Sequence, residues 1–173
     1  AKILLRAGQS ALLDSRERDA LDHFRAARAI APRGPLERES LVGEFFASVD
    51  LGLEGADVLL AELDELSSHG IEDLVRMSIA RTLYAERSGG LFDALAEARA
   101  VYPLVDRIVD PIIKTSFLNT YGQSLALTGH YEEALSIADE ATSAAAEYRL
   151  QFVMSHAAIL RAIAAIGLRD VSL

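Results

Sequence analysis

The sequence predicts an all-α protein, folded as an α-solenoid of about four and a half antiparallel helical hairpins. Three observations support this prediction. Apolar residues recur at spacings of three and four along most of the chain, which is the period of an amphipathic helix. Glycine and proline interrupt this pattern at short intervals, as they do at turns. The interruptions return with a regular period, as expected for stacked copies of one structural unit.

Two sets of markers define the period. The turn of each expected hairpin is marked by Ser15, Gly52, Gly89, Gly129 and Gly167. These turns are 37, 37, 40 and 38 residues apart. The start of each return helix is marked by Ala20, Ala56, Ala94 and Ala134, which are 36, 38 and 40 residues apart. Two helices of about 15 residues with short turns need roughly this length, so the period is that of one helical hairpin.

The first two hairpins are expected at residues 1–34 and 36–70. The first helix pattern begins at once, breaks at Asp14 and Ser15, and resumes until the breaker cluster 32–35. In the second hairpin the turn lies between Gly52 and Gly55. Its return helix is expected to stop at Ser67, Ser68, His69 and Gly70, where glycine suits the end of a helix.

The third and fourth hairpins are expected at residues 71–106 and 110–147, and a last helix at 149–167. Pro111 suits the first turn of the helix that it opens. No clear breaker separates the fourth hairpin from the last helix, so that boundary is placed near 148–150. The first helix has no preceding cap and the last has no return helix. We therefore expect residues 1–173 to be a single repeat domain within a larger protein.

Composition narrows the partners and the location. The chain has a formal charge of -9, and this disfavours direct nucleic-acid binding, which depends on clustered lysine and arginine. It has no cysteine, so thiolate chemistry and cysteine metal sites are excluded. No apolar run approaches the roughly 20 residues of a membrane span, and no export signal is apparent. A cytoplasmic location is expected, and the preference for arginine and alanine suggests a bacterial source.

The hairpins resemble the tetratricopeptide repeat (TPR). The first hairpin matches its pattern of apolar, small, aromatic and proline positions through Leu4, Gly8, Ala20, Phe24, Ala27 and Pro32. The fourth matches through Leu118, Gly122, Leu125, Gly129, Tyr131, Ala134 and Ala141. In the second and third hairpins Glu44 and Thr82 stand where a small residue is expected. The resemblance implies a right-handed superhelix whose concave surface is lined by the first helix of each hairpin.

A second resemblance concerns a narrower group. Residues 126–135 read Ala-Leu-Thr-Gly-His-Tyr-Glu-Glu-Ala-Leu, and the period exceeds the 34 residues of the TPR. Together with the arginine- and alanine-rich style, these features are similar to the helical sensor arms of large bacterial LuxR-type regulators of the maltose-regulon-activator kind. In that family an ATPase module precedes the arm and a DNA-binding domain follows it. The resemblance therefore implies signal transduction in transcriptional regulation.

No combination of residues in the sequence predicts catalysis. There is no phosphate-binding glycine loop, dinucleotide fingerprint or paired-histidine metal motif. Asp19, Asp22 and His23 lie close together, but such groups are far more often solvated than metal-binding. Glu132 and Glu133 fall in the first turn of a helix, where acidic side chains stabilise the helix dipole. We expect a protein that is not an enzyme and that has neither a cofactor nor a metal.

Projecting the repeat resemblance onto the sequence gives a set of candidate binding residues on the concave surface. They are Arg6, Gln9, Arg38, Phe45, Arg76, Leu83, Arg87, Asn119, Gln123 and Arg161. In one interpretation the arginines bind carboxylates, and Asn119 and Gln123 hold a peptide backbone. In the other, they are ordinary helix residues that pair with nearby acidic side chains.

The preferred function is a non-enzymatic repeat arm of a bacterial transcriptional regulator, serving protein–protein interaction or effector sensing. The alternative is an independent TPR-type adaptor or scaffold that binds peptides and has no connection with transcription. Expected partners are a protein or peptide, or a small effector in the groove, with neither nucleic acid nor membrane. The final helix carries Phe152, Ile159, Ile163 and Ile166. This apolar set suggests self-association through the C-terminal helix.

Overall fold

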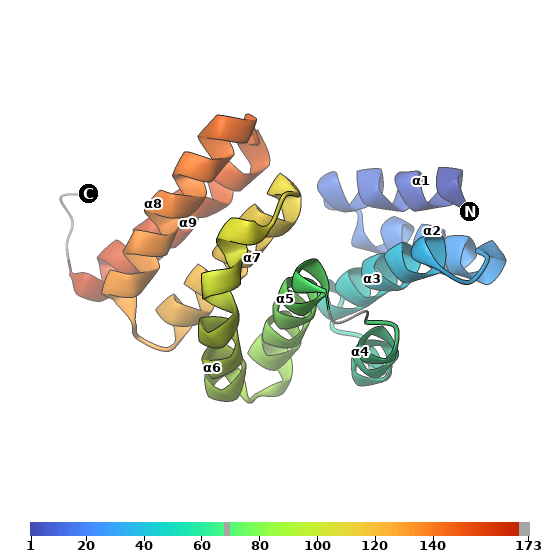
Figure 1. Cartoon of the computed structure of the whole chain (residues 1–173), viewed down its shortest axis with the longest axis horizontal. Helices are drawn as coiled ribbons and strands as arrows, with labels where there is room; N and C mark the ends of the chain where they lie inside the picture. The colour runs from blue at the N-terminus through green and yellow to red at the C-terminus, as the bar shows by residue number, and fades with distance from the viewer. Residues whose placement is uncertain (68–69, 170–173) are drawn as a thin grey trace. The chain divides into compact units, whose positions relative to one another are not determined.

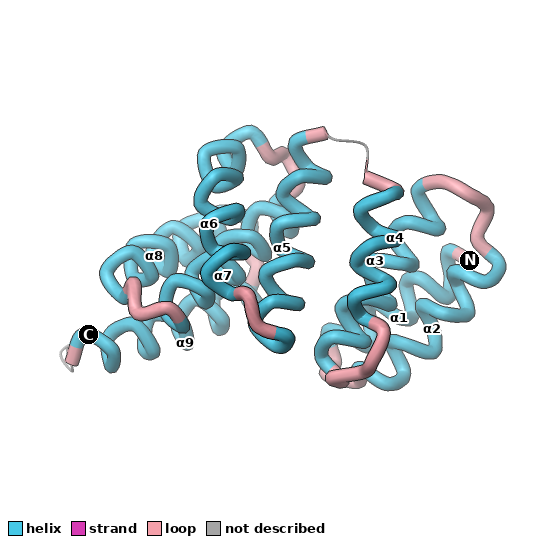
Figure 2. Tube along the Cα trace, turned by 90° about the horizontal axis from the view of Figure 1, so that it is seen from below, coloured by secondary structure: helices cyan, strands magenta, loops and turns pink. Residues whose placement is uncertain are grey.

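A computed structural model describes residues 1–67 and 70–169. All regular structure in these residues is helical, so the predicted all-α class is confirmed (Figures 1 and 2). The chain divides into two compact units, residues 1–68 and 69–173. Two residues of the predicted helix stop, Ser68 and His69, lie outside the described residues.

The first unit contains four helices. They are α1 (Lys2–Leu13), α2 (Glu17–Ile30), α3 (Pro35–Asp50) and α4 (Ala56–Glu65). α1 packs against α2, and α3 packs against both helices of this pair as well as against α4. A third helix laid across a helical pair covers apolar surface that the pair cannot bury alone.

Phe24 of α2 is the centre of this unit. Its side chain is 1% exposed and lies between two helical glycines, Gly8 of α1 and Gly43 of α3. A Cβ atom on Gly8 would lie 2.7 Å from the ring, and one on Gly43 would overlap it. Gly43 is thus the small residue of the second hairpin, and the sequence-based assignment of that position to Glu44 was wrong by one residue.

The second unit contains the remaining described helices. They are α5 (Ile71–Ser88), α6 (Leu91–Val101), the 3₁₀ helix η1 (Tyr102–Arg107), α7 (Pro111–Leu127), α8 (Tyr131–Tyr148) and α9 (Gln151–Leu168). α7 is the central helix, because it contacts α5, α6, η1, α8 and α9 (Figure 2). Its fully buried residues include Phe117, Leu118 and Leu125.

Four of the five expected turn markers lie in turns. Ser15, Gly52, Gly89 and Gly129 have φ angles of 54°, 63°, 94° and 83°, in the left-handed region that glycine adopts most easily. Gly167 was wrongly assigned to a turn. It lies inside α9, and a side chain there would overlap the ring of Tyr131. The four marker alanines are all buried.

The start of α7 has a side-chain cap. Asp110 Oδ1 accepts hydrogen bonds from the backbone N–H of Ile112 (2.8 Å) and Ile113 (3.4 Å), and Pro111 needs no partner because it has no N–H. We expect Asp110→Ala to lower the free energy of unfolding of the second unit by about 1 kcal/mol. Urea titration will measure this loss, and Asp110→Asn, which keeps the acceptor, should restore most of it.

The α8–α9 turn contains a strained residue. Arg149 has φ 57° and ψ 39°, a left-handed conformation that costs a residue with a Cβ atom about 1–2 kcal/mol. We expect Arg149→Gly to raise the stability of the second unit by about 0.5–1 kcal/mol, because glycine removes that strain but gains freedom in the unfolded chain. Arg149→Ala is the control and should have little effect in thermal unfolding.

Candidate binding surface

The structure places the ten predicted binding residues in different environments. Phe45 is a correction, because it is fully buried in the core of the first unit and cannot reach a ligand. Exposed members are Arg6, Gln9, Arg87, Gln123 and Arg161, and half-buried members are Arg38, Arg76, Leu83 and Asn119. Nine of the ten therefore have side chains that solvent can reach.

The two helices α5 and α7 bring part of the predicted set together. They pack against each other, and Gln123 Nε2 of α7 lies 3.4 Å from Glu86 Oε2 of α5. Glu86 and Gln123 are 37 residues apart, which is the interval between the turns of successive hairpins. They therefore occupy equivalent positions on neighbouring first helices. Asn119 lies one helical turn before Gln123, and Leu83 lies three residues before Glu86.

Glu86 is the electrostatically unusual residue of this surface. Its second carboxylate oxygen, Oε1, is buried and has no hydrogen-bond partner among the described residues. Loss of solvent raises the pKa of Glu86 to about 7, against the opposing effect of Arg87. The carboxyl group therefore changes protonation state near neutral pH. Sequence analysis missed Glu86, since a single glutamate on a helix gives no sign of its burial.

Other members of the predicted set form pairs elsewhere. Arg76 Nη2 of α5 lies 3.9 Å from Asp110 Oδ2 at the start of α7. Arg161 of α9 pairs with Asp139 of the return helix α8. Two of the predicted arginines therefore lie near carboxylates of the chain itself. For these two residues the structure favours the second interpretation, in which they pair with nearby acidic side chains.

Ion pairs also link successive return helices. In the first unit Arg28 of α2 pairs with Glu62 of α4. In the second unit Arg99 Nη2 of α6 donates to both oxygens of Glu133 of α8, at 2.8 and 3.0 Å. Both pairs join residues 34 positions apart. A search for oppositely charged residues at this fixed separation could have found them in the sequence.

Glu44 is the buried charge of the first unit. Its two oxygens accept from Arg25 Nε and Arg28 Nη1, both at 3.1 Å, and its side chain is 10% exposed. A buried carboxylate needs such partners, because an unpaired charge in the protein interior is costly. With the Arg28–Glu62 pair, these contacts join α2, α3 and α4.

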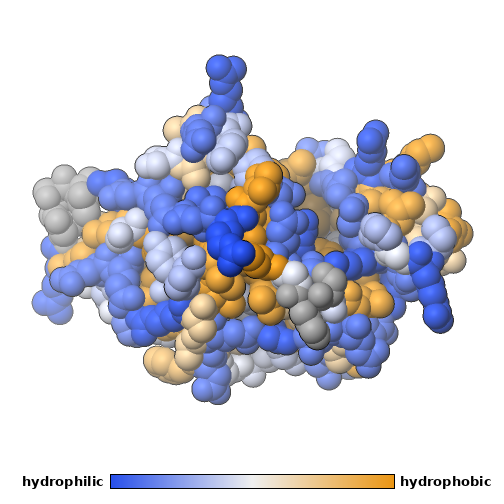
Figure 3. Space-filling model, in the orientation of Figure 1, coloured by the Kyte–Doolittle hydropathy of each residue, from blue (hydrophilic) through white to orange (hydrophobic). Residues whose placement is uncertain are grey.

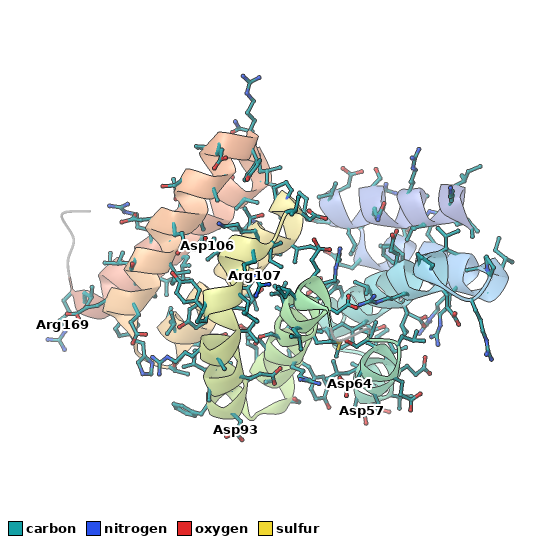
Figure 4. The ribbon with its side chains drawn as sticks, in the orientation of Figure 1. Asp57, Asp64, Asp93, Asp106, Arg107 and Arg169 are labelled. Carbon is teal, nitrogen blue, oxygen red and sulfur yellow. The ribbon has the colours of Figure 1, made fainter. Side chains whose placement is uncertain are left out.

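A polar cluster fixes η1 against α7 and α8. The Tyr102 hydroxyl donates to Glu140 Oε2 at 2.6 Å, and its ring lies 5.3 Å from that of Tyr121. The bond to Glu140 raises the pKa of Tyr102 well above its ordinary value. Burial raises the pKa of Tyr121 as well. Asp106, labelled in Figure 4, accepts from Lys114 Nζ at 2.9 Å.

Charged and apolar side chains are unevenly distributed on the visible face of the protein. Figure 3 shows this face as mostly hydrophilic, with an apolar area over the region of α6 and η1. Charged residues labelled in Figure 4 lie on the outer sides of α4, α6 and α9. No group of three or more histidine, aspartate or glutamate side chains among the described residues could hold a metal ion.

Comparisons with known proteins assign no family to the chain. No protein-family model matches it, and neither a curated protein nor a solved structure is significantly similar to it. Among the described helices, α9 is the one with the length and apolar composition of a membrane span. Length and composition alone are weak indications, because core helices of soluble proteins share them.

Proposed function

We propose that this chain is a non-enzymatic helical-repeat arm that binds a protein, a peptide or a small effector. In the preferred form of this proposal it belongs to a bacterial LuxR-type transcriptional regulator and acts in the cytoplasm. Its hairpins then form one right-handed, TPR-like solenoid. The observation that carries the proposal is the packing of successive first helices, because that packing builds a continuous surface from short repeats.

This packing recurs within each unit. α1 contacts α3 in the first unit, and α5 contacts α7 and α7 contacts α9 in the second. Each later first helix also contacts the return helix before it, in the pairs α2–α3, α6–α7 and α8–α9. The Arg–Glu pairs 34 residues apart add a repeated link between return helices. A set of contacts shared by successive hairpins is typical of stacked repeats.

The α5–α7 surface is the favoured binding region. It offers amide groups at Asn119 and Gln123, an apolar side chain at Leu83 and the half-buried carboxyl group of Glu86. Amides can form two hydrogen bonds with a peptide backbone, and a neighbouring apolar residue can contact a side chain. No arrangement of a nucleophile, a base and an orienting group accompanies them, so binding is the function that this surface supports best.

A peptide-array experiment tests the binding surface. Peptides that bind the wild-type chain are measured again with the double variant Asn119→Ala, Gln123→Ala. We expect affinity to fall about tenfold, while the free energy of unfolding stays within about 0.5 kcal/mol, since both changes lie at the surface. The matched control is Ser143→Ala with Glu147→Ala, two exposed residues of α8. Equal affinity of the double variant and the wild type would refute the assignment of this surface.

The independent-adaptor alternative has a separate test. The open reading frame that encodes this chain is sequenced in both directions. An ATPase module upstream and a helix-turn-helix domain downstream would support the regulator. Their absence would favour a TPR-type adaptor or scaffold that binds peptides without a role in transcription. Turnover of a substrate by the chain would contradict both forms of the proposal.

A further inference from the structure

One face of α9 carries an exposed apolar stripe. Its residues are Phe152, His156, Ile159, Ile163 and Ile166, and we refer to them as the α9 stripe. Phe152, Ile159 and Ile166 are 58%, 60% and 74% exposed. The opposite apolar face of the same helix, with Val153, Leu160 and others, is buried, and α9 contacts α7 and α8. α9 thus has one apolar face in use and a second one in solvent.

The spacing of the α9 stripe indicates the kind of partner. Its members are separated by 4, 3, 4 and 3 residues. This is the alternation of the core positions of a coiled coil, which place large side chains along one seam toward a neighbouring helix. The ring of Phe152 is packed on that of His156, with centroids 4.2 Å apart, so the start of the stripe is already ordered. A helix is therefore the partner that fits the stripe.

Charge identifies that helix as α9 of a second copy. The chain has a net charge of -9, so two copies repel each other over most of their surfaces. α9 carries no aspartate or glutamate, and its Arg161 pairs with Asp139 of its own α8. The exposed residues beside the stripe include Ser155, Ala158 and Ala162, which are small and uncharged. Two α9 helices can therefore approach closely without opposing like charges.

We propose that the α9 stripe is a self-association surface through which two copies of this chain pair by antiparallel packing of their α9 helices. A two-fold axis then sets Ile159 of each copy against Ile163 of the other, and the pairing is the same from either side. The stripe spans Phe152 to Ile166, about 21 Å of helix. One helix pair of this length buries less than the roughly 800 Å² per partner of a standard interface, so the dimer is weak.

Sedimentation velocity over a concentration series tests this pairing. The intact chain should shift from monomer to dimer with a midpoint on the order of 10 µM, as expected for a small interface. Ile159→Glu should move the midpoint upward by at least about tenfold, because it places a charge in the seam. The matched control is Ile30→Glu on α2, where the wild-type side chain is 62% exposed. This control should leave the midpoint unchanged.

Three results would overturn the proposal. The first is a wild-type chain that stays monomeric up to about 1 mM. The second is a dimer that survives Ile159→Glu while circular dichroism shows the variant to be folded, since the copies then meet elsewhere. The third is binding of the monomer to vesicles of phosphatidylcholine and phosphatidylglycerol that Ile159→Glu abolishes and Ile30→Glu preserves. That outcome would assign the stripe to a membrane surface.

Discussion

Replacing Phe24 with alanine is expected to lower the free energy of unfolding of the first unit by about 3–5 kcal/mol. The ring is the part of α2 that lies between Gly8 and Gly43, so its removal leaves a cavity lined by two helix backbones. Backbones cannot fill a void by changing rotamer, and the cost should therefore be near the top of the usual range. Urea unfolding followed by helical circular dichroism will measure it.

Gly43→Ala tests the same contact from the other side. Alanine is the better helix former by about 1 kcal/mol, yet its Cβ atom would overlap the Phe24 ring. The ring has no free side to move toward, because Gly8 faces it as well. We expect a net loss of about 1–3 kcal/mol from overpacking.

A double-mutant cycle separates these two effects. In a Phe24→Leu background the smaller side chain leaves room for the new methyl group, so Gly43→Ala should cost much less there. Gly122→Ala is a useful comparison, because the nearest atom to its Cβ would be the terminal Cδ2 atom of Leu160, which can rotate away. Additive effects of Phe24→Leu and Gly43→Ala would contradict the proposed close contact.

Helices and turns could be predicted from the sequence because their signals are local. The turn at Gly129 needs a left-handed residue between two amphipathic stretches, and both requirements are visible within a few residues. The boundary near residues 148–150 was harder to place because the turn residue there is Arg149, not glycine. Its left-handed conformation is imposed by the packing of α8 against α9, which leaves no compositional signal.

The binding surface could be predicted only in part, for a geometrical reason. A helix turns by about 100° per residue, so an alignment error of one residue moves a side chain from the surface into the core. This explains why Gly43, and not Glu44, contacts Phe24, and why Phe45 is buried. Contacts between distant side chains, such as that of Glu86 with Gln123, depend on the register of two helices. No single stretch of sequence determines that register.

Glu86→Gln is expected to stabilise the second unit above neutral pH and to remove a pH dependence that the wild type shows. The pKa of the folded-state carboxyl group is about 7, against an ordinary value of 4.5. Between these two values the folded protein holds the proton and the unfolded chain has released it. Stability therefore falls as pH rises from about 4.5, and the loss is complete just above pH 7.

The size of this effect follows from the same pKa difference. Full burial would make the loss about 3 kcal/mol, and the partial exposure of Glu86 reduces it to about 2 kcal/mol. Glutamine resembles the protonated acid in shape and carries no charge, and its amide can still pair with Gln123. We therefore expect Glu86→Gln to gain about 2 kcal/mol over the wild type at pH 8 and much less near pH 5.

Urea titrations at a series of pH values between about 5 and 8.5 will measure this difference. Glu147→Gln is the matched control, because it removes the same charge from an exposed position on α8 and lowers the net charge equally. If both variants changed stability by the same amount at every pH, general charge repulsion would explain the gain. A gain confined to Glu86→Gln, and growing between pH 5 and 7, can arise only from the burial of this one carboxyl group. Because that group contacts Gln123, a ligand that donates a hydrogen bond to Glu86 should then bind more tightly as the pH rises and the carboxylate forms.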